Sequence, residues 1–358
     1  MNILQIFSKT FGSSGSRQTI QLSKELQKRG HNVTLIVPPD SSWENTIQKN
    51  GVNVIYYNLK GIKPIFKIRS ILKKSQIDIV HVHRGRACNY AWLASLGLSN
   101  CSIVASVSKN IGSRFKFLHS IKKVMTESER KKNDLCNLGV PEEKIEVIYF
   151  GTNLEKFNPN ISGAEIRKEF DIQENSPLIG MVGHFKEAKG HQYFVSAADI
   201  ILKQIPEARF ILVGSGKIHL KKIEKMVSSL NLEDKIILTG YRDDVPECMA
   251  AMDIYVDSSI DGVGLSGTLC EAIAMRKPVV LTSLPGNNEI ITDEETGIFV
   301  PPKSSEAIAA AVLKLIRDKE LSDKLAAKGR NLAEKKFSEE SRVNQIEKLY
   351  QSLVNGKI

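Results

Sequence analysis

Short apolar runs alternate with amphipathic segments along the first part of the chain. Between the runs, apolar residues recur three or four positions apart, most clearly in residues 17–29, where the helical pattern stops at Gly30. This order predicts an open parallel sheet with helices on both faces. The runs with the length of buried strands are residues 2–7, 31–37, 52–57, 78–83, 102–107, 124–126 and 145–149.

The pattern stops at residues 150–163, which are rich in Gly, Asn and Pro, and then starts again. The later apolar runs are residues 178–182, 209–213, 235–239, 253–257, 278–282 and 297–300. We therefore expect two doubly wound α/β domains in tandem. Their predicted limits are 1–155 for an N-terminal domain, 156–335 for a C-terminal domain and 336–358 for a last helix. Spacing alone leaves open whether that helix packs back on the first domain.

Composition fits this organisation. The chain has 358 residues, 42% hydrophobic and 25% charged, as expected for a folded protein of about two domains. Its five cysteines are odd in number and form no C-x-x-C pair, which favours a reducing compartment over a disulfide framework. Neither a signal peptide nor a run of about 18 apolar residues is visible. These features predict a cytoplasmic protein.

Charge is distributed unevenly between the two halves. Residues 1–150 hold 23 Lys/Arg and 10 Asp/Glu, whereas residues 151–358 hold 27 and 30. Basic amphipathic segments at 61–76 and 113–124 suit an anionic membrane surface, and a merely solvated basic face explains them equally well. Nucleic acid is not an expected partner, since aromatics make up only 6% and no nucleic-acid motif is present.

Ligands of open parallel sheets bind beyond the carboxyl ends of the strands, so the loops there are the first place to look for chemistry. Gly12 and Gly15 follow the first strand, where a plain turn is an equal alternative. After the first strand of the second domain, Lys186 and Lys189 stand in the loop 183–190. Two ammonium groups there suit a departing diphosphate, and a solvated lysine pair is the other interpretation.

A glycine-rich loop at 261–267 leads into a predicted helix that begins near Ser266. The free amides of its first turn would bind an anion or a hydroxyl. Glu271, one turn further, stands among apolar residues and needs a partner, for which ribose hydroxyls are a natural choice. The loop 240–246 offers backbone groups to a base edge. Its Asp243-Asp244 pair is not the D-x-D of metal-dependent transferases, so we infer no metal and no cofactor.

These segments resemble glycosyltransferase family 4, the retaining enzymes of GT-B fold. The resemblance spans nearly the whole chain and is more specific in the second domain. It rests on GSSGSRQTIQLSKELQKRGHNV (12–33), DIVHVH (78–83), EEKIEVIYFGTNLEKFNP (142–159), VGHFKEAKG (182–190), ILVGSG (211–216), LTGYRDDVPECMAAMDIYVDSS (238–259), GLSGTLCEAIAMRKPVV (264–280) and LPGNNEIITDEETGIFVPP (284–302).

The resemblance implies a fold, an activity and site residues. The fold is two Rossmann-like doubly wound domains facing a central cleft, with 1–155 as the acceptor-side domain and 156–335 as the nucleotide-sugar-binding domain. The activity is hexosyltransferase-type transfer, with retention, from a nucleotide diphosphate-sugar to a glycan or lipid-linked acceptor such as lipopolysaccharide or capsule. Lys189 matches the diphosphate lysine, and Glu271 the second glutamate of E-x7-E. The other expected donor contacts are Gly12, Gly15, Gly183, His184, Gly214, Tyr241, Arg242, Gly264, Leu265, Ser266, Gly267 and Thr268.

The chain departs from the family pattern at three points. Val263 stands where the first glutamate of E-x7-E is expected, and Asp261 is the nearest carboxylate. His184 replaces the usual arginine, a loss for which Lys186 can substitute as catalytic cation. Ser108 replaces a histidine often found near the reacting carbon, and His83 is expected to take over its role.

The family mechanism uses no side-chain nucleophile. An oxygen of the donor β-phosphate accepts the acceptor's proton on the same face, while Lys189, Lys186 and the helix amides near Ser266 stabilise the leaving diphosphate. Two alternatives stay open at this point: a GT-B epimerase, and a protein that binds a nucleotide-sugar without turnover.

Overall fold

The computed structural model describes residues 1–8, 14–39, 47, 51–83, 85–98, 101–107, 121–261 and 265–356. The predicted site residues Gly12 and Gly264, together with Val263, Ser108 and most of the basic segment 113–124, lie outside these ranges. The chain divides into two compact units, which are described separately. Unit 1 comprises 1–149 and 342–358, and unit 2 comprises 150–341.

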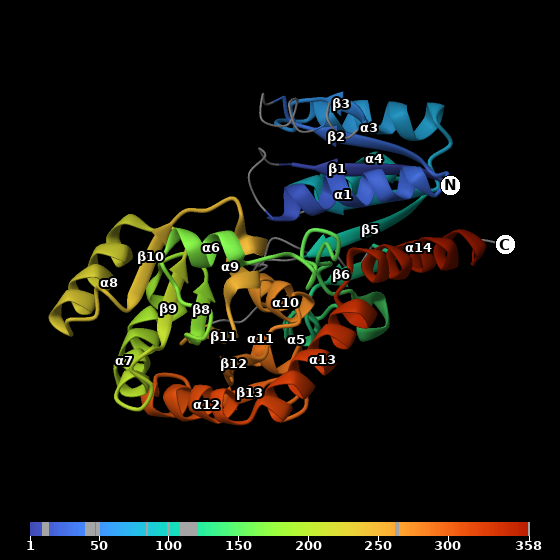
Figure 1. The fold of residues 1–358 in the computed structure, drawn as a ribbon. Helices are drawn as coiled ribbons and strands as arrows, with labels where there is room; N and C mark the ends of the chain where they lie inside the picture. Colours follow the sequence, from blue (N-terminus) through green and yellow to red (C-terminus); the bar gives the residue numbers. More distant parts are fainter. Residues whose placement is uncertain are drawn as a thin grey trace. The chain divides into compact units, whose positions relative to one another are not determined.

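Unit 1 is built on a parallel sheet of the predicted kind, with strand order β3-β2-β1-β4-β5-β6-β7. Figure 1 shows these strands, coloured blue to green. The order reverses between β1 and β4, which makes this pair the topological switch point of the sheet. The strands are β1 (Asn2–Phe7), β2 (Asn32–Val37), β3 (Asn53–Tyr56), β4 (Ile79–His83), β5 (Ser102–Val107), β6 (Lys123–Thr126) and β7 (Ile145–Val147).

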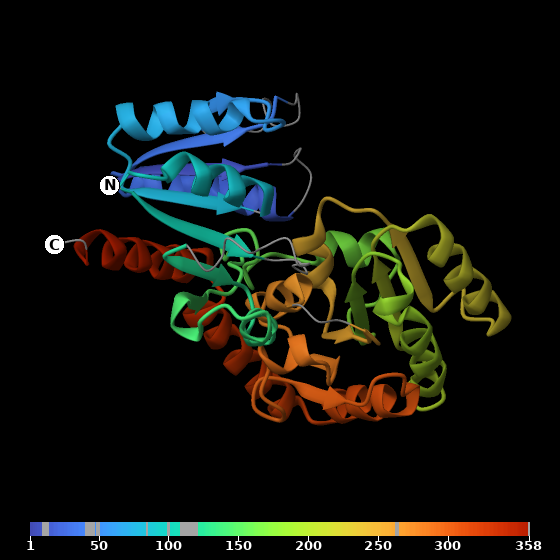
Figure 2. The ribbon, with the colours of Figure 1, turned by 180° about the vertical axis from the view of Figure 1, so that it is seen from behind.

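Alternate residues of β1 supply two separate cores, as a strand buried on both faces must. Ile3 packs with Leu22 and Leu26 of α1, whereas Leu4 packs with α3 and α4 on the other face. Figure 2 shows α3 and α4 side by side on the face of the sheet turned toward the viewer. The helices of unit 1 are α1 (Ser14–Lys28), α3 (Lys63–Lys74), α4 (Gly85–Ser95), α5 (Glu129–Asn137), the 3₁₀ turn η2 (Glu142–Lys144) and most of α14 (Glu339–Asn355).

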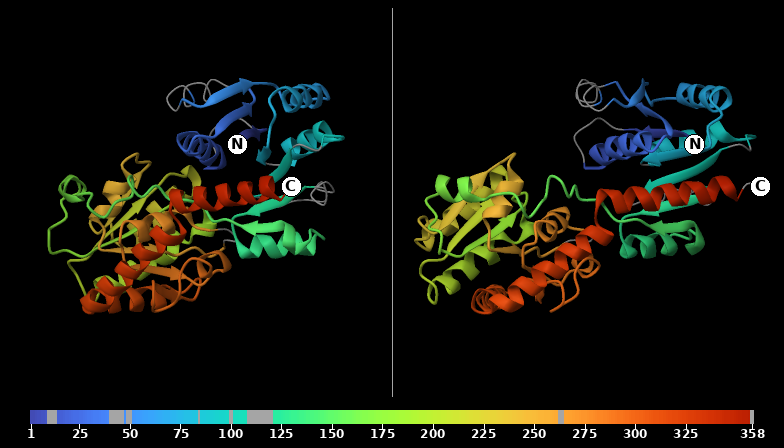
Figure 3. Two further views of the ribbon diagram at one scale, coloured as in Figure 1. Left: turned by 90° about the vertical axis from the view of Figure 1, so that its right-hand side faces the viewer. Right: turned by 45° about the vertical axis from the view of Figure 1, so that its right-hand side comes forward.

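The last helix, α14, packs on unit 1. Its buried residues Val343, Ile346, Leu349 and Tyr350 join the cluster that contains Ile3 and the α1 leucines. The Tyr350 hydroxyl lies 2.6 Å from Nδ1 of the buried His81 in β4. Figure 3 shows this helix, in red, running beside the strands of unit 1. The end of the chain therefore completes the core of its beginning.

Unit 2 repeats the architecture with strand order β10-β9-β8-β11-β12-β13, all parallel. The predicted fold class, a pair of Rossmann-like doubly wound sheets, is thus confirmed. The strands are β8 (Leu178–Val182), β9 (Arg209–Val213), β10 (Ile236–Gly240), β11 (Ile254–Asp257), β12 (Val279–Thr282) and β13 (Ile298–Val300). The helical segments are α6 (Ala164–Glu169), η3 (Glu187–Lys189), α7 (His191–Leu202), α8 (Lys217–Ser229), α9 (Val245–Ala251), α10 (Gly267–Ala274), α11 (Pro285–Asn288), α12 (Ser305–Arg317) and α13 (Lys319–Lys336).

The second switch point lies between β8 and β11, which are neighbours in the sheet although α7, β9, α8, β10 and α9 separate them in sequence. None of the helices in the described ranges is both long and apolar enough to cross a bilayer.

Candidate functional site

The switch point of the second sheet brings the predicted lysine loop together with the end of β11. The chain leaves β8 at Gly183 and reaches Lys189 in η3, while the chain leaving β11 passes through Ser258 and Ser259. The two loops leave neighbouring strands and contact each other, since the Ser258 hydroxyl donates to the Gly190 carbonyl at 3.0 Å. They lie at the edge of the sheet where ligands of this fold bind. The amino terminus of α10 follows on the β11 side. This edge of unit 2 is therefore the candidate site.

Glycines allow the backbones at this edge to pack closely. Gly190 adopts φ +65°, and a Cβ there would lie 2.0 Å from the carbonyl oxygen of Ser258. A Cβ on Gly214 would lie 1.8 Å from the Gly183 carbonyl oxygen. Neither position can hold a side chain without moving backbone, so the loops after β8, β9 and β11 are fixed against one another. The predicted site residues Gly183 and Gly214 serve this packing.

Lys189 is anchored to the end of β11 by a chain of hydrogen bonds. Its Nζ donates to Ser259 Oγ at 3.4 Å, and the Ser259 hydroxyl in turn donates to Asp257 Oδ1. Asp257 is only 2% exposed. Its other oxygen, Oδ2, accepts from Ser266 Oγ at 3.0 Å. A single buried carboxylate thus connects the predicted diphosphate lysine with the start of α10.

Ser266 is the N-cap residue of α10, as the sequence predicts, but its side chain does not cap the helix. The hydroxyl donates to Asp257 instead and lies 3.3 Å from Thr268 Oγ1. In the described part of the chain no side chain accepts from the first amides of α10. Gly267 is exposed, and Leu265 is half-buried just ahead of the cap. The amino end of this helix is thus open to an anion.

Glu271 lies one turn further along α10 and is half-buried, in agreement with the expectation of a sheltered carboxylate. It is close enough to Cys270 to affect that thiol: burial first, and the Glu271 charge second, raise the pKa of Cys270 to about 12. Burial likewise raises the pKa of the Tyr255 phenol well above its usual value, with Asp257 as the next cause. The Cys270 thiol and the Tyr255 phenol therefore stay neutral at pH 7.

Of the remaining predicted residues of unit 2, three are exposed and one is held in ion pairs. Lys186 and His184 are exposed on the loop before Lys189. Tyr241 is 73% exposed, its hydroxyl donating to Asp243 at 2.6 Å. The Arg242 guanidinium is not free for a ligand, because it binds Asp244 and Glu169 at 2.6–2.8 Å.

Arg242 therefore links the start of α9 to α6. These hydrogen bonds, to Asp244 first and Glu169 second, raise the pKa of Arg242 above its usual value. The loop 240–246 can therefore bind a ligand through its backbone groups and through Tyr241.

In unit 1, His83 ends β4 beside the switch point, as predicted, but it faces the sheet. Its ring is 6% exposed, and Nε2 lies 2.8 Å from Gln5 Oε1. Its ring centroid lies 4.0 Å from that of His81, with the two ring planes tilted by 40°. Gly15 lies in the first turn of α1 rather than in the loop before it. A catalytic role of His83 stays a prediction.

Asp257 and Ser259 were not among the predicted site residues. One sequence signal could have identified them: Asp257-Ser258-Ser259 is a polar run that directly follows the apolar residues 254–256. Polar residues at the carboxyl end of a buried parallel strand mark a site, because that edge is where ligands bind.

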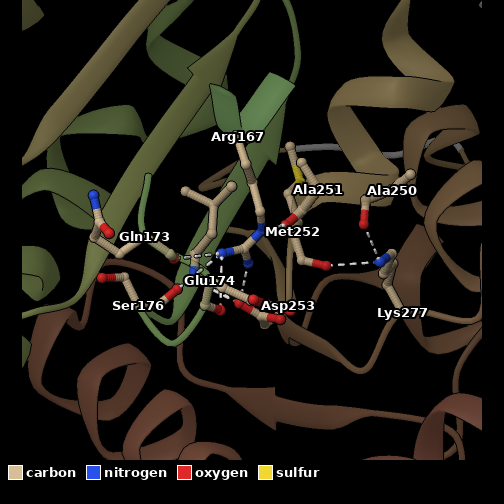
Figure 4. A network of polar contacts seen from close by, with 10 residues as sticks. Arg167, Gln173, Glu174, Ser176, Ala250, Ala251, Met252, Asp253 and Lys277 are labelled. Carbon is tan, nitrogen blue, oxygen red and sulfur yellow. Dashed lines mark hydrogen bonds and ion pairs between the residues drawn. The ribbon is translucent and has the colours of Figure 1, made fainter. Parts of the chain in front are cut away.

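A cavity of about 600 Å³ lies at the opposite edge, where β8, β11 and β12 begin. There Arg167 donates to Asp253 at 2.7 Å and to the Ala251 carbonyl at 3.1 Å (Figure 4). Lys277 donates to the carbonyls of Ala250 and Met252, both at 2.7 Å. Burial lowers the pKa of Lys277 to about 8. Because these cations bind the chain's own carbonyls and Asp253, we assign this edge a structural role.

Two family models match the chain in succession. The model of Glycosyltransferase Family 4 covers residues 15–156, and that of Glycosyl transferases group 1 covers residues 163–332. The second model contains the whole switch point with Lys189, Asp257 and α10. The chain belongs to glycosyltransferase family 4. The predicted resemblance is confirmed, and with it the assignment as a glycosyltransferase enzyme.

Curated relatives and solved structures agree with this family. An Escherichia coli protein, UDP-Gal:alpha-D-GlcNAc-diphosphoundecaprenol alpha-1,3-galactosyltransferase, is 26% identical over 84% of this chain and 81% of its own. N-acetyl-alpha-D-glucosaminyl L-malate synthase of Bacillus anthracis is 24% identical over 97% of both chains. A Rickettsia africae glycosyltransferase structure superposes with a TM-score of 0.89, 26% identity and coverage of 99% and 98%. Anabaena HepE, solved with UDP, shares the GT-B fold at a TM-score of 0.85 and 18% identity, covering 98% and 100%.

Proposed function

We propose that this glycosyltransferase moves a hexose, with retention, from a nucleotide diphosphate-sugar to a glycan or lipid-linked acceptor of the cell envelope. One observation carries the proposal: the Lys189 ammonium and the uncapped amino terminus of α10 are joined through Asp257 at the switch point of unit 2. A lysine and free helix amides are the groups that stabilise a departing diphosphate.

The names of the relatives support this choice of substrates. The name of the Escherichia coli relative specifies UDP-Gal as donor and a diphosphoundecaprenol-linked sugar as acceptor. A Rhizobium meliloti relative, 26% identical over 58% of this chain, is a lipopolysaccharide core mannosyltransferase. Anabaena HepE has been solved in complex with UDP and with UDP-glucose. A sugar nucleotide and a lipid-linked or lipopolysaccharide acceptor are therefore the first pair to test.

Each residue has a part in the proposed reaction. Lys189, Lys186 and the first amides of α10 neutralise the charge that develops on the β-phosphate as the sugar leaves. The β-phosphate oxygen then accepts the acceptor's proton on the same face of the sugar, so that no side-chain nucleophile is required. Glu271 accepts the ribose hydroxyls. Since the catalysis is electrostatic, one well-placed donor is worth about 3–4 kcal/mol.

Replacing Lys189 with Ala tests this assignment. Turnover should fall by about a hundred-fold or more, because the lost cation acts on developing charge, while the melting temperature stays near that of the wild type. The measurement is release of nucleoside diphosphate from UDP-, GDP-, dTDP- and CDP-sugars with a lipid-linked acceptor. Lys235→Ala is the matched control, since its Nζ also donates to one acceptor, the Pro206 carbonyl, outside the site.

Three outcomes would contradict the proposal. Near-full activity of Lys189→Ala would show that the diphosphate site is misassigned. A sugar nucleotide that binds without turnover in the presence of acceptors would favour a non-catalytic binding protein. Interconversion of donor sugars without any acceptor would favour an epimerase.

We further propose that the enzyme works in the cytoplasm at the inner face of the membrane, which it contacts through α3. In the structure, α3 and its N-cap present apolar side chains on two sides, one buried and one exposed. Ile68 and Leu72 are buried in unit 1. Ile62 and Phe66, one turn apart on the outer side, are 69% and 66% exposed. Six Lys and Arg and no acid lie in residues 60–77.

A vesicle-binding assay tests this contact. Ile62→Ser/Phe66→Ser should bind vesicles containing phosphatidylglycerol about tenfold more weakly than the wild type, because two partly inserted apolar side chains are lost. Ile218→Ser is the matched control, since Ile218 is 74% exposed on α8 of unit 2. Equal binding of both variants, or wild-type binding that is as strong on neutral phosphatidylcholine, would refute the contact.

A further inference from the structure

Asp257 is a buried carboxylate without a function in the reaction as proposed above. It lies at the carboxyl end of β11 and is 2% exposed, yet it forms no salt bridge among the described residues. Three donors satisfy it instead: the Ser259 amide at 3.1 Å, the Ser259 hydroxyl, and the Ser266 hydroxyl at 3.0 Å. A buried charge held by neutral hydroxyls is costly, so a role in the site is a reasonable explanation of its presence.

The contacts of Asp257 determine the direction of both serine hydroxyls. A hydroxyl has one proton to donate and two lone pairs that accept. The carboxylate takes the proton of Ser259, so Ser259 can only accept from Lys189, and the Lys189 Nζ lies 3.4 Å away. That contact uses one of the three ammonium protons and leaves two for a ligand.

The same argument applies to Ser266 on the other oxygen. A serine at an N-cap ordinarily accepts from a first-turn amide of its own helix. The carboxylate draws the Ser266 hydroxyl away from that position, and no capping hydrogen bond forms. The helix thereby loses a stabilising contact and retains free amides for an anion. Asp257 thus governs both elements that the proposed reaction uses.

We infer that Asp257 is a positioning residue: through Ser259 it orients Lys189 toward the diphosphate, and through Ser266 it keeps the amino terminus of α10 uncapped. The inference rests on the proposed function, because it presupposes that a nucleoside diphosphate binds there. Asp257 itself does not touch the ligand. Its carboxylate lies behind the two serines, which separate it from the anion that it would otherwise repel.

Asp257→Asn tests the inference, because an amide keeps the size of the side chain but has only one accepting oxygen. Either Ser259 or Ser266 must then accept a hydrogen bond from the amide group or lose its hydrogen bond to residue 257. The affinity for the nucleoside diphosphate that binds the wild type best, chosen from UDP, GDP, dTDP and CDP, should fall about tenfold. kcat should fall at least as much, because the same groups act on the leaving diphosphate.

Asp253→Asn is the matched control. Asp253 immediately precedes β11 at the opposite edge and is also a carboxylate with strong partners, Arg167 at 2.7 Å and the Leu178 amide at 2.7 Å. Figure 4 shows it within the structural network of that edge. Asp253→Asn should lower the melting temperature and change nucleotide affinity by less than about twofold. An equal loss of affinity in both variants would show that Asp257 acts through general stability alone.

A double-mutant cycle separates positioning from structure and does not depend on Asp257→Asn alone. Ser259→Ala removes the hydroxyl that connects Lys189 with Asp257. Combined with Lys189→Ala it should cost little more affinity than Lys189→Ala by itself, because both changes break one chain of contacts. Additive losses would overturn the inference, as would wild-type affinity of Asp257→Asn or Ser259→Ala.

The outcomes also distinguish this inference from the function on which it rests. If none of the four nucleotides binds the wild type, the proposed function and the inference fail together. If a nucleotide binds and Lys189→Ala lowers turnover while Asp257→Asn does not, only the inference fails.

Discussion

Two residues beyond Lys189, His191 stands at the start of α7 and is 2% exposed, with its ring stacked 4.3 Å from that of Phe185. Burial, followed by the charge of Lys189, lowers the pKa of His191 to about 4. The unfolded chain, with an ordinary pKa near 6.5, binds more protons than the folded chain between these values. Stability that is present above pH 6.5 is therefore lost as the pH falls toward 4.

His191→Phe should flatten that dependence. A phenyl ring retains the stacking on Phe185 and does not titrate, so the difference in unfolding free energy between pH 7 and pH 4 should shrink by about 3 kcal/mol. The measurement is denaturant unfolding at several pH values for both proteins. Burial also lowers the pKa of His81. The contribution of such groups to the pH dependence is the same in both proteins and cancels in the comparison. A pH profile identical to that of the wild type would show that His191 is accessible to protons when folded.

At the scale of elements, the apolar runs predicted the strands to within two residues. Five-residue runs such as 178–182 and 209–213 match β8 and β9 at both ends, because strands buried on both faces consist almost wholly of apolar residues. The start of α10 at Ser266 was also predicted, from the glycine-rich loop before it. What the sequence did not predict is that Ser266 leaves its helix uncapped, since the cause is Asp257 on another element.

The contacts that complete the site join positions far apart in sequence. Lys189 and Ser259 are 70 residues apart, and the periodicity of apolar residues gives no information on contacts at that separation. The two sides of α3 show the same limit. The amphipathic pattern of 61–76 predicts one apolar face with Ile65, Ile68 and Leu72, of which Ile68 and Leu72 are buried. The pattern does not predict that Phe66 points outward, where it is 66% exposed. Local patterns fix which elements form, whereas packing decides which side chains remain free.

At the scale of the whole molecule, the chain is not a simple tandem of two units. Unit 1 is formed by residues 1–149 and by 342–358, so part of its core comes from residues that follow unit 2 in the sequence. The predicted boundaries at 155 and 335 treated the last helix as a separate segment. Spacing left open whether this helix packs back on the first domain, and nothing in the sequence specified Ile3, Leu22 and Leu26 as the surface that it covers.

Removal of residues 342–358 should therefore lower the stability of unit 1 more than that of unit 2. Val343, Ile346, Leu349 and Tyr350 would be lost from the core of unit 1, at about 1.5–3 kcal/mol for each apolar side chain, against a typical domain stability of about 5–15 kcal/mol. Hydrogen exchange should show lost protection in β1 and β4 and retained protection in β8 and β11. Gln351→Ala, an exposed position of the same helix, is the control. Uniform loss across both sheets would mean that the two units unfold as one, and unchanged protection in β1 would mean that α14 contributes little to a core that the first 149 residues already complete.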